Sequence, residues 1–461
     1  HKLPVDQNLF MALIAPRGLM LSTALSEGAS NPWGIEQAYH ASRKVYDFLG
    51  ASEKLAIKSR YGLHSVCARD MEEYIDFFNY VFNRSPRKPE NKLFYEYSFE
   101  NWVDLSGEYA DMKDYNRQET PDLLNSFSNK KINTVAEWKN RRSGIIRDIK
   151  WALGKEPGGV TNPGPGSLSK GGRGEAGFGT FLVRPLPVSG VGVMSVSPYS
   201  GFGDQLFGYL YYPQDKEGNL SGNDLPVVVY LHEYDYSKGF NSYHRIEEII
   251  SSFVDEGYAV FCYDMLGFGN RVEEGTHFYD RYPNWSKMGK MVSDVRGAVD
   301  ALVNMDFIDG KRIYISGYSL GAAVGLYSAA LDDRICGVIS VCGFTPMRTD
   351  LQGRGTEGIK RFSHLHGLIP KLGFFVNNED RIPYDYHELI AAIAPRPVLV
   401  IAPEYDKDAY IEDIKLCVEE VRKVYALYGL PENIELYSPA DISRLSPEVR
   451  EKMYKWVRSK K

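Results

Sequence analysis

A serine between two glycines is the residue best suited to do chemistry in this chain. Ser319 lies in Gly317-Tyr318-Ser319-Leu320-Gly321, after a predicted strand at 312–316 and before a predicted helix at 320–331. Glycines on both sides permit the tight strand-to-helix turn that presents a nucleophilic serine. The alternative is a serine that only caps a glycine-rich helix start. The strand, turn and helix in this order favour the nucleophile.

A nucleophilic serine also needs backbone donors for the oxyanion that forms when it attacks a carbonyl. The first donor is expected to be the N–H of Leu320. The second is expected from the loop after the predicted strand 226–231, where Glu233 or Tyr234 would supply it. His232 opens this loop, and we expect it to shape the loop. The alternative is a hydrogen-bonded residue that only ends the strand.

An acid and a base should follow the last two strands of such a fold, because the serine must lose its proton to an oriented imidazole. The loop after the predicted strand 397–402 offers Asp406 as the acid. The base should follow the final strand at 433–437. The loop 437–444 contains no histidine. The position of the base is therefore open.

Residues 1–87 repeat the C-terminal third of the chain without a gap, at an offset of 379 positions. The matching segments are Pro4-Val5-Asp6 with Pro383-Tyr384-Asp385, Ala15-Pro16-Arg17 with Ala394-Pro395-Arg396, and Arg43-Lys44-Val45-Tyr46 with Arg422-Lys423-Val424-Tyr425. At this offset Glu27 falls on Asp406, and His64 falls on Ser443. The first copy therefore holds an acid and a base without a serine, and the second holds a serine and an acid without a histidine.

Three explanations compete for the missing base. Another histidine of the second copy could take the role, with His366 and His364 as candidates and His387 as a weaker one, although lone histidines are commonly structural. The second copy could instead be a catalytically degenerate domain that binds or scaffolds. Under the third explanation, His64 would reach across to Ser319 from the first copy.

Strands and helices alternate through most of the chain, which is typical of an α/β fold with a mostly parallel sheet flanked by helices. The repeat divides the chain into a C-terminal fragment of an upstream domain at 1–87, a linker at 88–129 and a complete domain at 130–461. A helix is predicted at 135–153, and the glycine-rich stretch 154–178 is predicted to be a loop.

Composition excludes several classes of function. A formal net charge of −6 argues against a nucleic-acid partner, which would require a basic surface. The five cysteines are scattered and predict neither a disulfide framework nor a metal site. No apolar run is long enough to span a membrane. Gly267-Phe268-Gly269 follows a strand but lacks the third glycine of a dinucleotide-binding loop. We therefore expect no cofactor and no metal.

The motifs resemble carbohydrate esterases of the α/β-hydrolase superfamily. Residues 1–87 resemble the C-terminal part of a glucuronoyl esterase in Leu3-Pro4-Val5-Asp6-Gln7, the run at 12–18, Asn31-Pro32, the run at 41–46, Gly50 and Gly62-Leu63-His64. Residues 130–461 are similar to acetyl xylan esterases and dienelactone-hydrolase-like proteins, in the Trp138 helix, the Asp264 loop, the serine turn and Ala394-Pro395-Arg396-Pro397. The resemblance implies that His64 is the base and Glu27 an acid of the upstream domain.

The resemblance also implies a function and a location. The expected activity is serine-dependent hydrolysis of acetyl, methyl or glucuronoyl esters on plant cell-wall polysaccharides or oligosaccharides, through an acyl-enzyme. The alternatives are a degenerate domain that binds carbohydrate or acts as a scaffold, and a serine peptidase on the same fold. A secreted or periplasmic location is expected, with the export signal preceding His1, since the chain does not begin with Met.

Overall fold

The computed structural model describes most of the chain and divides it into two units. The described residues are 4–27, 31–118, 122–125, 131–157, 188–196, 206, 208–234, 239–241, 246–350 and 358–460. The first unit is formed within His1–Glu96 and Gly267–His277. The second is formed within Tyr97–Tyr234, Gly239–Leu266 and Phe278–Lys461. Each unit is described separately below.

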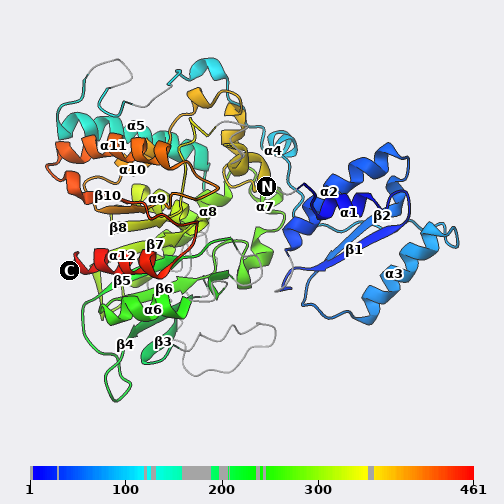
Figure 1. The fold of residues 1–461 in the computed structure, drawn as a ribbon, viewed down its shortest axis with the longest axis horizontal. Coiled ribbons are helices and arrows are strands. Elements are labelled where there is room, and N and C mark those ends of the chain that lie inside the picture. The colour runs from blue at the N-terminus through cyan, green and yellow to red at the C-terminus, as the bar shows by residue number, and fades with distance from the viewer. Residues whose placement is uncertain are drawn as a thin grey trace. The chain divides into compact units, whose positions relative to one another are not determined.

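The second unit is built on an eight-stranded sheet with the order β10-β9-β8-β7-β5-β6-β4-β3 (Figure 1). Its strands are β3 (Val191–Val196), β4 (Gly208–Pro213), β5 (Leu225–Leu231), β6 (Ala259–Tyr263), β7 (Ile308–Tyr318), β8 (Ile335–Val341), β9 (Val398–Ile401) and β10 (Ile434–Tyr437). Pairing is parallel from β10 to β6, and β4 is antiparallel to both of its neighbours. The α/β-hydrolase fold expected from the sequence is therefore confirmed, with an additional antiparallel edge.

Helices cover both faces of this sheet. The longer helices of the unit are α4 (Phe99–Ser106), α5 (Val135–Leu153), α6 (Ile246–Asp255), α8 (Lys287–Leu302), α9 (Leu320–Leu331), α11 (Ile411–Leu427) and α12 (Pro447–Arg458), and the short ones are α7 (Phe278–Arg281) and α10 (Tyr386–Ala391). α6 and α12 pack on one face through a buried cluster that includes Phe253, Trp456 and Tyr230. α9 packs on the other face, against β5, β7 and β8.

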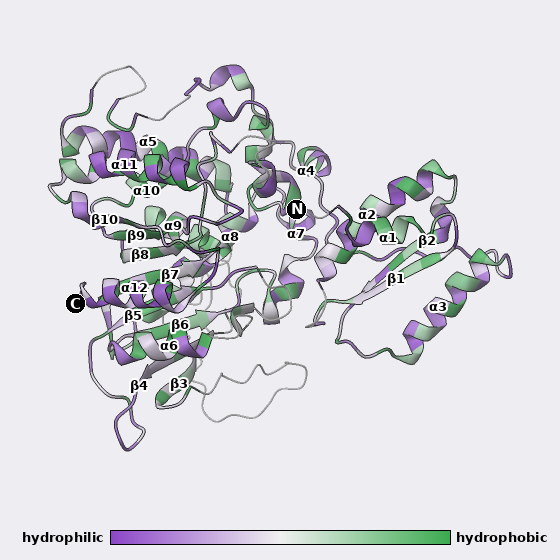
Figure 2. Ribbon diagram, in the orientation of Figure 1, coloured by the Kyte–Doolittle hydropathy of each residue, from purple (hydrophilic) through white to green (hydrophobic). Residues whose placement is uncertain are grey.

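Burial explains why these segments form strands in the centre of a sheet. Every residue of β5, β6 and β9 is buried, and Figure 2 shows hydrophobic residues along the strands. Parallel strands covered by helices on both faces are expected to be apolar throughout rather than alternating. α5 begins with a capping box, in which Thr134 and Glu137 satisfy each other's backbone N–H groups.

The first unit is a smaller layer of helices on two parallel strands. Its elements are α1 (Gln7–Ala12), β1 (Leu19–Ala24), α2 (Pro32–Phe48), β2 (Leu55–Arg60) and α3 (Ala68–Val81). Its core includes Tyr39, Tyr46 and Ile57. Glu36 is fully buried and accepts hydrogen bonds from the Ser59 hydroxyl (2.6 Å) and from the backbone N–H of Phe94 and Tyr95 (2.8 Å each). Burial raises its pKa in spite of these bonds.

The elements of the first unit begin 379 positions before elements of the second. α1 and α10, β1 and β9, α2 and α11, β2 and β10, and α3 and α12 all start at this offset. The register is also repeated, since Leu19 pairs with Leu55 and Val398 pairs with Ile434. Both copies have a cis proline peptide, Ala15-Pro16 and Ala394-Pro395. The repeat seen in the residues thus extends to the local structure.

The stretch 88–129, predicted to be a linker, contributes to both units. The second unit begins at Tyr97, so α4 belongs to it. The indole N–H of Trp102 on α4 donates to the carbonyl of Pro283 (2.8 Å). In the described ranges, no helix combines the length and the apolar character that a membrane crossing requires.

Candidate active site

Ser319 occupies a strained turn between β7 and α9. Its backbone angles are φ 52° and ψ −113°, in a region that residues other than glycine seldom adopt. Its N–H donates to the carbonyl of Val341 (2.9 Å), which ties the turn to β8. Strain of this kind is retained where the surrounding structure imposes it, and functional sites are where it concentrates. The turn has the geometry of a nucleophile elbow.

The two glycines of the turn are required by close contacts of the backbone. A Cβ atom on Gly317 would lie 2.4 Å from the carbonyl carbon and oxygen of Gly321. A Cβ atom on Gly321 would lie 2.1 Å from the carbonyl oxygen of Leu231 and 2.7 Å from that of His232. The loop after β5 therefore lies against the start of α9. The structure brings together the two segments expected to supply oxyanion donors, next to Leu320 and at Glu233.

His232 holds this loop in place. Its side chain is fully buried, its Nδ1–H donates to the carbonyl of Glu233 (2.6 Å), and its Nε2 accepts from the N–H of Met265 (3.0 Å). A ring that donates from one nitrogen and accepts at the other is neutral, and burial lowers its pKa to about 4. Because His232 binds the Glu233 carbonyl, the N–H of Tyr234 in the same peptide points to the opposite side.

The neutral state of His232 makes the stability of the fold depend on pH. Its pKa is 6.5 in the unfolded chain and about 4 in the folded chain. As pH falls below 6.5 the unfolded chain binds the proton first, so stability is lost. We expect a loss of about 2 kcal/mol from this residue between pH 7 and pH 5. Urea unfolding at both values checks this. The variant His232→Asn keeps a donor for the Glu233 carbonyl and does not titrate. Its free energy of unfolding should therefore fall by about 2 kcal/mol less, between pH 7 and pH 5, than that of the unsubstituted chain. An equal fall in both proteins would contradict the assignment of a neutral, buried His232.

Asp406 lies after β9 and is partly buried. Its Oδ1 accepts the N–H of Asp408 (2.9 Å). Burial raises its pKa, while this hydrogen bond and the nearby Arg361 guanidinium oppose the rise. The Cys342 thiol interacts with both Asp406 and Ser443, and burial raises its pKa to about 12. The predicted acid therefore lies at the same sheet edge as the position that lacks a histidine, and both residues influence the pKa of the Cys342 thiol.

Ser443 occupies the position where the base was expected. The hydroxyl of Tyr318, the neighbour of Ser319, donates to the Ser443 carbonyl (3.2 Å) and lies 3.5 Å from its Oγ. This contact places the loop after β10 beside the elbow. In the part of the chain that the structure describes, no histidine is hydrogen-bonded to Ser319 Oγ.

The three histidines considered as replacements have other contacts. His364 stacks on Phe99, with ring centroids 4.6 Å apart, and its Nδ1 is 2.9 Å from Ser363 Oγ. His366 stacks on Tyr234 of the oxyanion loop at 4.5 Å, and burial lowers its pKa to about 4.

His387 belongs to a buried charged cluster. Its Nδ1 lies 3.8 Å from Asp385, which also accepts the backbone N–H groups of Met347 and Arg348. The Arg348 guanidinium pairs with Glu388 (3.1 Å). These contacts give His387 a structural environment. Of the three histidines, His366 alone packs on a segment of the candidate site.

Two basic residues of this region were not anticipated from the sequence. Arg361 donates to the carbonyl of Asp408 (3.1 Å) and acts electrostatically on Asp406 and Tyr234. Lys287 is desolvated, which lowers its pKa to about 8. Lys287 acts electrostatically on His366. Neither basic residue lies in a recognisable motif.

The two residues of the first copy that were predicted to be an acid and a base lie together. His64 Nδ1 is 2.5 Å from Glu27 Oε1, and the imidazole is largely exposed, with 87% of its side-chain area accessible. These are the two residues that the repeat places on Ser443 and Asp406. Among the described residues, no cluster of three or more histidine, cysteine or carboxylate side chains could hold a metal ion.

Comparison with known proteins relates the chain to carbohydrate esterases. The family described as glucuronyl esterase, fungi, matches residues 241–429. Carbohydrate esterase MZ0003, from an unknown prokaryotic organism, is 22% identical over 383 residues, covering 71% of this chain and 84% of that protein. Apart from Gly267–His277, the matched residues belong to the second unit, for which the sequence motifs had pointed to acetyl xylan esterases.

Solved structures share the fold. A glucuronoyl esterase from Solibacter usitatus superposes with a TM-score of 0.57 at 15% identity, covering 75% of this chain and 99% of that one. The glucuronoyl esterase catalytic domain from Hypocrea jecorina superposes with a TM-score of 0.51 at 16% identity, covering 77% and 91%. With the family match, these likenesses identify the chain as an α/β-hydrolase related to the carbohydrate esterases.

Proposed function

We propose that the chain hydrolyses a carboxylic ester of a plant cell-wall carbohydrate, an acetyl, methyl or glucuronoyl ester, with Ser319 as the nucleophile. Hydrolysis of a carbohydrate ester is the function that the family match and the relative support. The observation that carries the proposal is the strained backbone of Ser319, set between two glycines that admit no side chain.

The proposed reaction has two steps. Ser319 Oγ attacks the ester carbonyl carbon and gives up its proton to the departing alcohol, which is the sugar hydroxyl of an acetyl ester, methanol from a methyl ester or the esterified alcohol of a glucuronoyl ester, and an acyl-enzyme forms. Water then attacks the acyl group, releases the carboxylic acid and restores the serine. The N–H of Leu320 and one N–H of Glu233 or Tyr234 would hold the oxyanion in both steps. Asp406 would orient the base that carries the proton.

Labelling with a fluorophosphonate probe tests the nucleophile directly. The full chain is expected to form one adduct on Ser319, and Ser319→Ala is expected to form none. The same two proteins are then assayed on acetylated xylan, on benzyl glucuronate and on aminoacyl p-nitroanilides. Release of acid from the first two, and not from the anilides, distinguishes an esterase from a peptidase. A chain without an adduct on Ser319 would not be the proposed enzyme.

A second candidate function has its own supporting observation. No imidazole of the described residues is hydrogen-bonded to Ser319 Oγ, and Ser443 stands at the expected base position. Both facts favour a degenerate hydrolase that binds carbohydrate or serves as a scaffold. Retention on insoluble xylan by a chain that forms no probe adduct would support this second function.

A further inference from the structure

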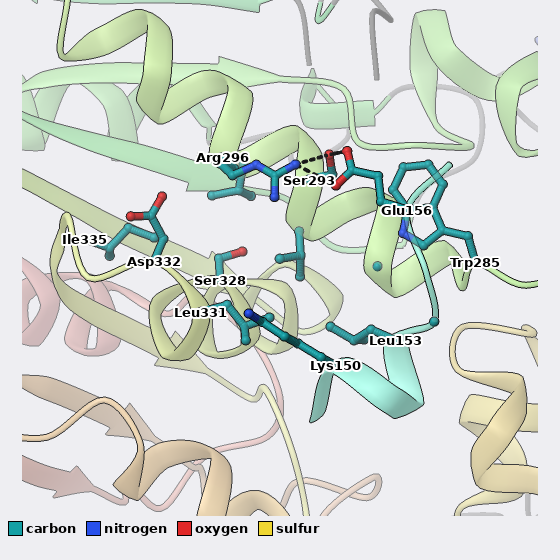
Figure 3. Close-up of a pocket in the computed structure, with 14 residues that line it drawn as sticks. Lys150, Leu153, Glu156, Trp285, Ser293, Arg296, Ser328, Leu331, Asp332 and Ile335 are labelled. Carbon is teal, nitrogen blue, oxygen red and sulfur yellow. Dashed lines mark hydrogen bonds and ion pairs between the residues drawn. The ribbon is translucent and has the colours of Figure 1, made fainter. Parts of the chain in front are cut away.

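A cavity of 260 Å³ lies in the second unit, away from the elbow (Figure 3). It is bounded by the end of α5, by α8 and by the last turn of α9. Ser328 on α9 lines it and is eight residues from Leu320, so it lies about 12 Å along the helix from the elbow. The cavity has room for about nine water-sized groups. It is therefore separate from the candidate active site.

Some charged side chains of the cavity lining form ion pairs within the described residues, and one does not. Glu156 accepts hydrogen bonds from the Ser293 hydroxyl (2.8 Å) and from the Arg296 guanidinium (2.7 Å), and Asp332 is paired with Arg334 (2.6 Å). These pairs cancel each other's charge. In the described ranges, Lys150 is the charged side chain of the lining that forms no ion pair, so its ammonium group is available to an anion.

Ser328 provides a second unsatisfied group. Its side chain is 1% exposed, and its hydroxyl has no hydrogen-bond partner within the described residues. A buried hydroxyl without a partner is costly and uncommon in folded proteins. Figure 3 shows that the hydroxyl points into the cavity, on the side to which the amine of Lys150 also extends. Both groups belong to the lining and are donors without a partner in the described ranges.

The electrostatic surroundings permit an anion there. The last turn of a helix is normally unfavourable to negative charge, because its carbonyl oxygens are unpaired. On α9 these carbonyls accept from guanidinium groups, since Arg396 binds the oxygen of Ala329 (2.7 Å) and Arg142 binds that of Ala330 (3.3 Å). The remaining walls are apolar and are formed by Leu153, Trp285, Val292, Val295, Leu331 and Ile335.

We infer that this cavity binds a small monocarboxylate with a compact apolar body. The carboxylate would accept from the Lys150 ammonium and the Ser328 hydroxyl, and the body would lie against the apolar walls. A carboxylate held by a charged donor in a partly enclosed site forms stronger hydrogen bonds than a neutral acceptor does. The site is independent of the activity of Ser319.

Calorimetric titration of the full chain with benzoate tests the inference. We expect binding with a Kd of about 1 mM or tighter. Lys150→Ala and Ser328→Ala should each weaken it about tenfold, while Lys155→Ala, a neighbouring exposed lysine outside the lining, should leave it unchanged. Ser328→Ala should not lower the urea midpoint, because it removes a hydroxyl that has no partner.

Two further ligands test separately whether the cavity requires the negative charge and the apolar body of the ligand. Benzamide has the shape of benzoate without the charge, and glucuronate has the charge without the apolar body. Both are expected to bind at least about tenfold more weakly than benzoate. Equal binding of benzamide, equal binding of glucuronate, no binding of benzoate, or equal affinity in all three variants would each overturn the inference.

Discussion

Replacing Ser443 with histidine is expected to raise hydrolysis of p-nitrophenyl acetate at least about 100-fold, because it places an imidazole where the repeat and the fold lead us to expect the base. A positioned general base contributes about 10²- to 10⁴-fold to such reactions. Ser443 is in a half-buried loop, held to the elbow by the Tyr318 hydroxyl (3.2 Å). A longer side chain there would start next to the hydroxyl of Tyr318, the neighbour of Ser319 in the elbow. The measurement is the initial rate at pH 8, where an unperturbed imidazole is mostly neutral.

The first unit shows the geometry that the substitution should recreate. Its strands β1 and β2 have the register of β9 and β10, and the loops after them place Glu27 Oε1 2.5 Å from His64 Nδ1. Glu27 is longer by one methylene than Asp406. The double variant Ser443→His with Asp406→Glu therefore tests whether the acid must be longer to contact the new imidazole. If Ser443→His fails and the double variant succeeds, the position is right and the acid is too short.

Two controls separate triad catalysis from hydrolysis by a surface imidazole. Ser319→Ala in the Ser443→His background should return the rate to the uncatalysed level, because triad catalysis requires the serine. Hydrolysis by a surface histidine would instead persist without Ser319. Asp406→Asn in the same background should remove most of the gain, because an acid fixes the tautomer of the base. If neither histidine variant gains activity that depends on Ser319, the second unit lacks a catalytic arrangement that a base can complete.

The elements that were predicted well are those with strong local signals. The predicted helices at 135–153 and 320–331 coincide with α5 and α9. A capping box starts the first, and the glycine-flanked turn starts the second. The central strands were also found, because apolar runs of this length between helices read as buried parallel strands. Their ends differ from the observed ones by a few residues.

The antiparallel edge of the sheet was missed. β3 (Val191–Val196) follows the glycine-rich stretch, and β4 (Gly208–Pro213) begins with glycine and ends with proline. Glycine and proline lower strand propensity, and an edge hairpin is set by pairing with β6 rather than by its own residues. Such pairing cannot be read from a single segment.

In the candidate site, the repeat was more informative than residue type. It linked Glu27 to His64, which the structure places in contact. Residue type alone gave His364 and His387 as candidate bases, although His364 packs on an aromatic ring and His387 lies in a buried charged cluster. The influence of Asp406 and Ser443 on the Cys342 thiol carried no sequence signal, because the three residues belong to separate segments of the chain.

Substituting Gly321 with alanine is expected to destabilise the second unit by about 3 kcal/mol and to abolish probe labelling of Ser319. The new Cβ would meet the carbonyl oxygens of Leu231 (2.1 Å) and His232 (2.7 Å), which are backbone atoms of a buried strand end and cannot rotate away. Relief would require α9 to move away from β5. That movement would displace Leu320 from the oxyanion loop.

Gly144→Ala is the matched control for this prediction. Gly144 lies on α5, where a Cβ would meet only the flexible end of Arg147 at 3.7 Å. Alanine there is expected to be neutral or to stabilise by up to about 1 kcal/mol, since it restricts the unfolded chain and favours the helix. Urea unfolding followed by tryptophan fluorescence compares the two. Equal midpoints would mean that the close approach of α9 to β5 does not exist in solution. A lower midpoint for Gly321→Ala alone would mean that the helix presenting Ser319 is held by backbone contact, so that the elbow's geometry is built into the sheet and does not depend on a bound substrate.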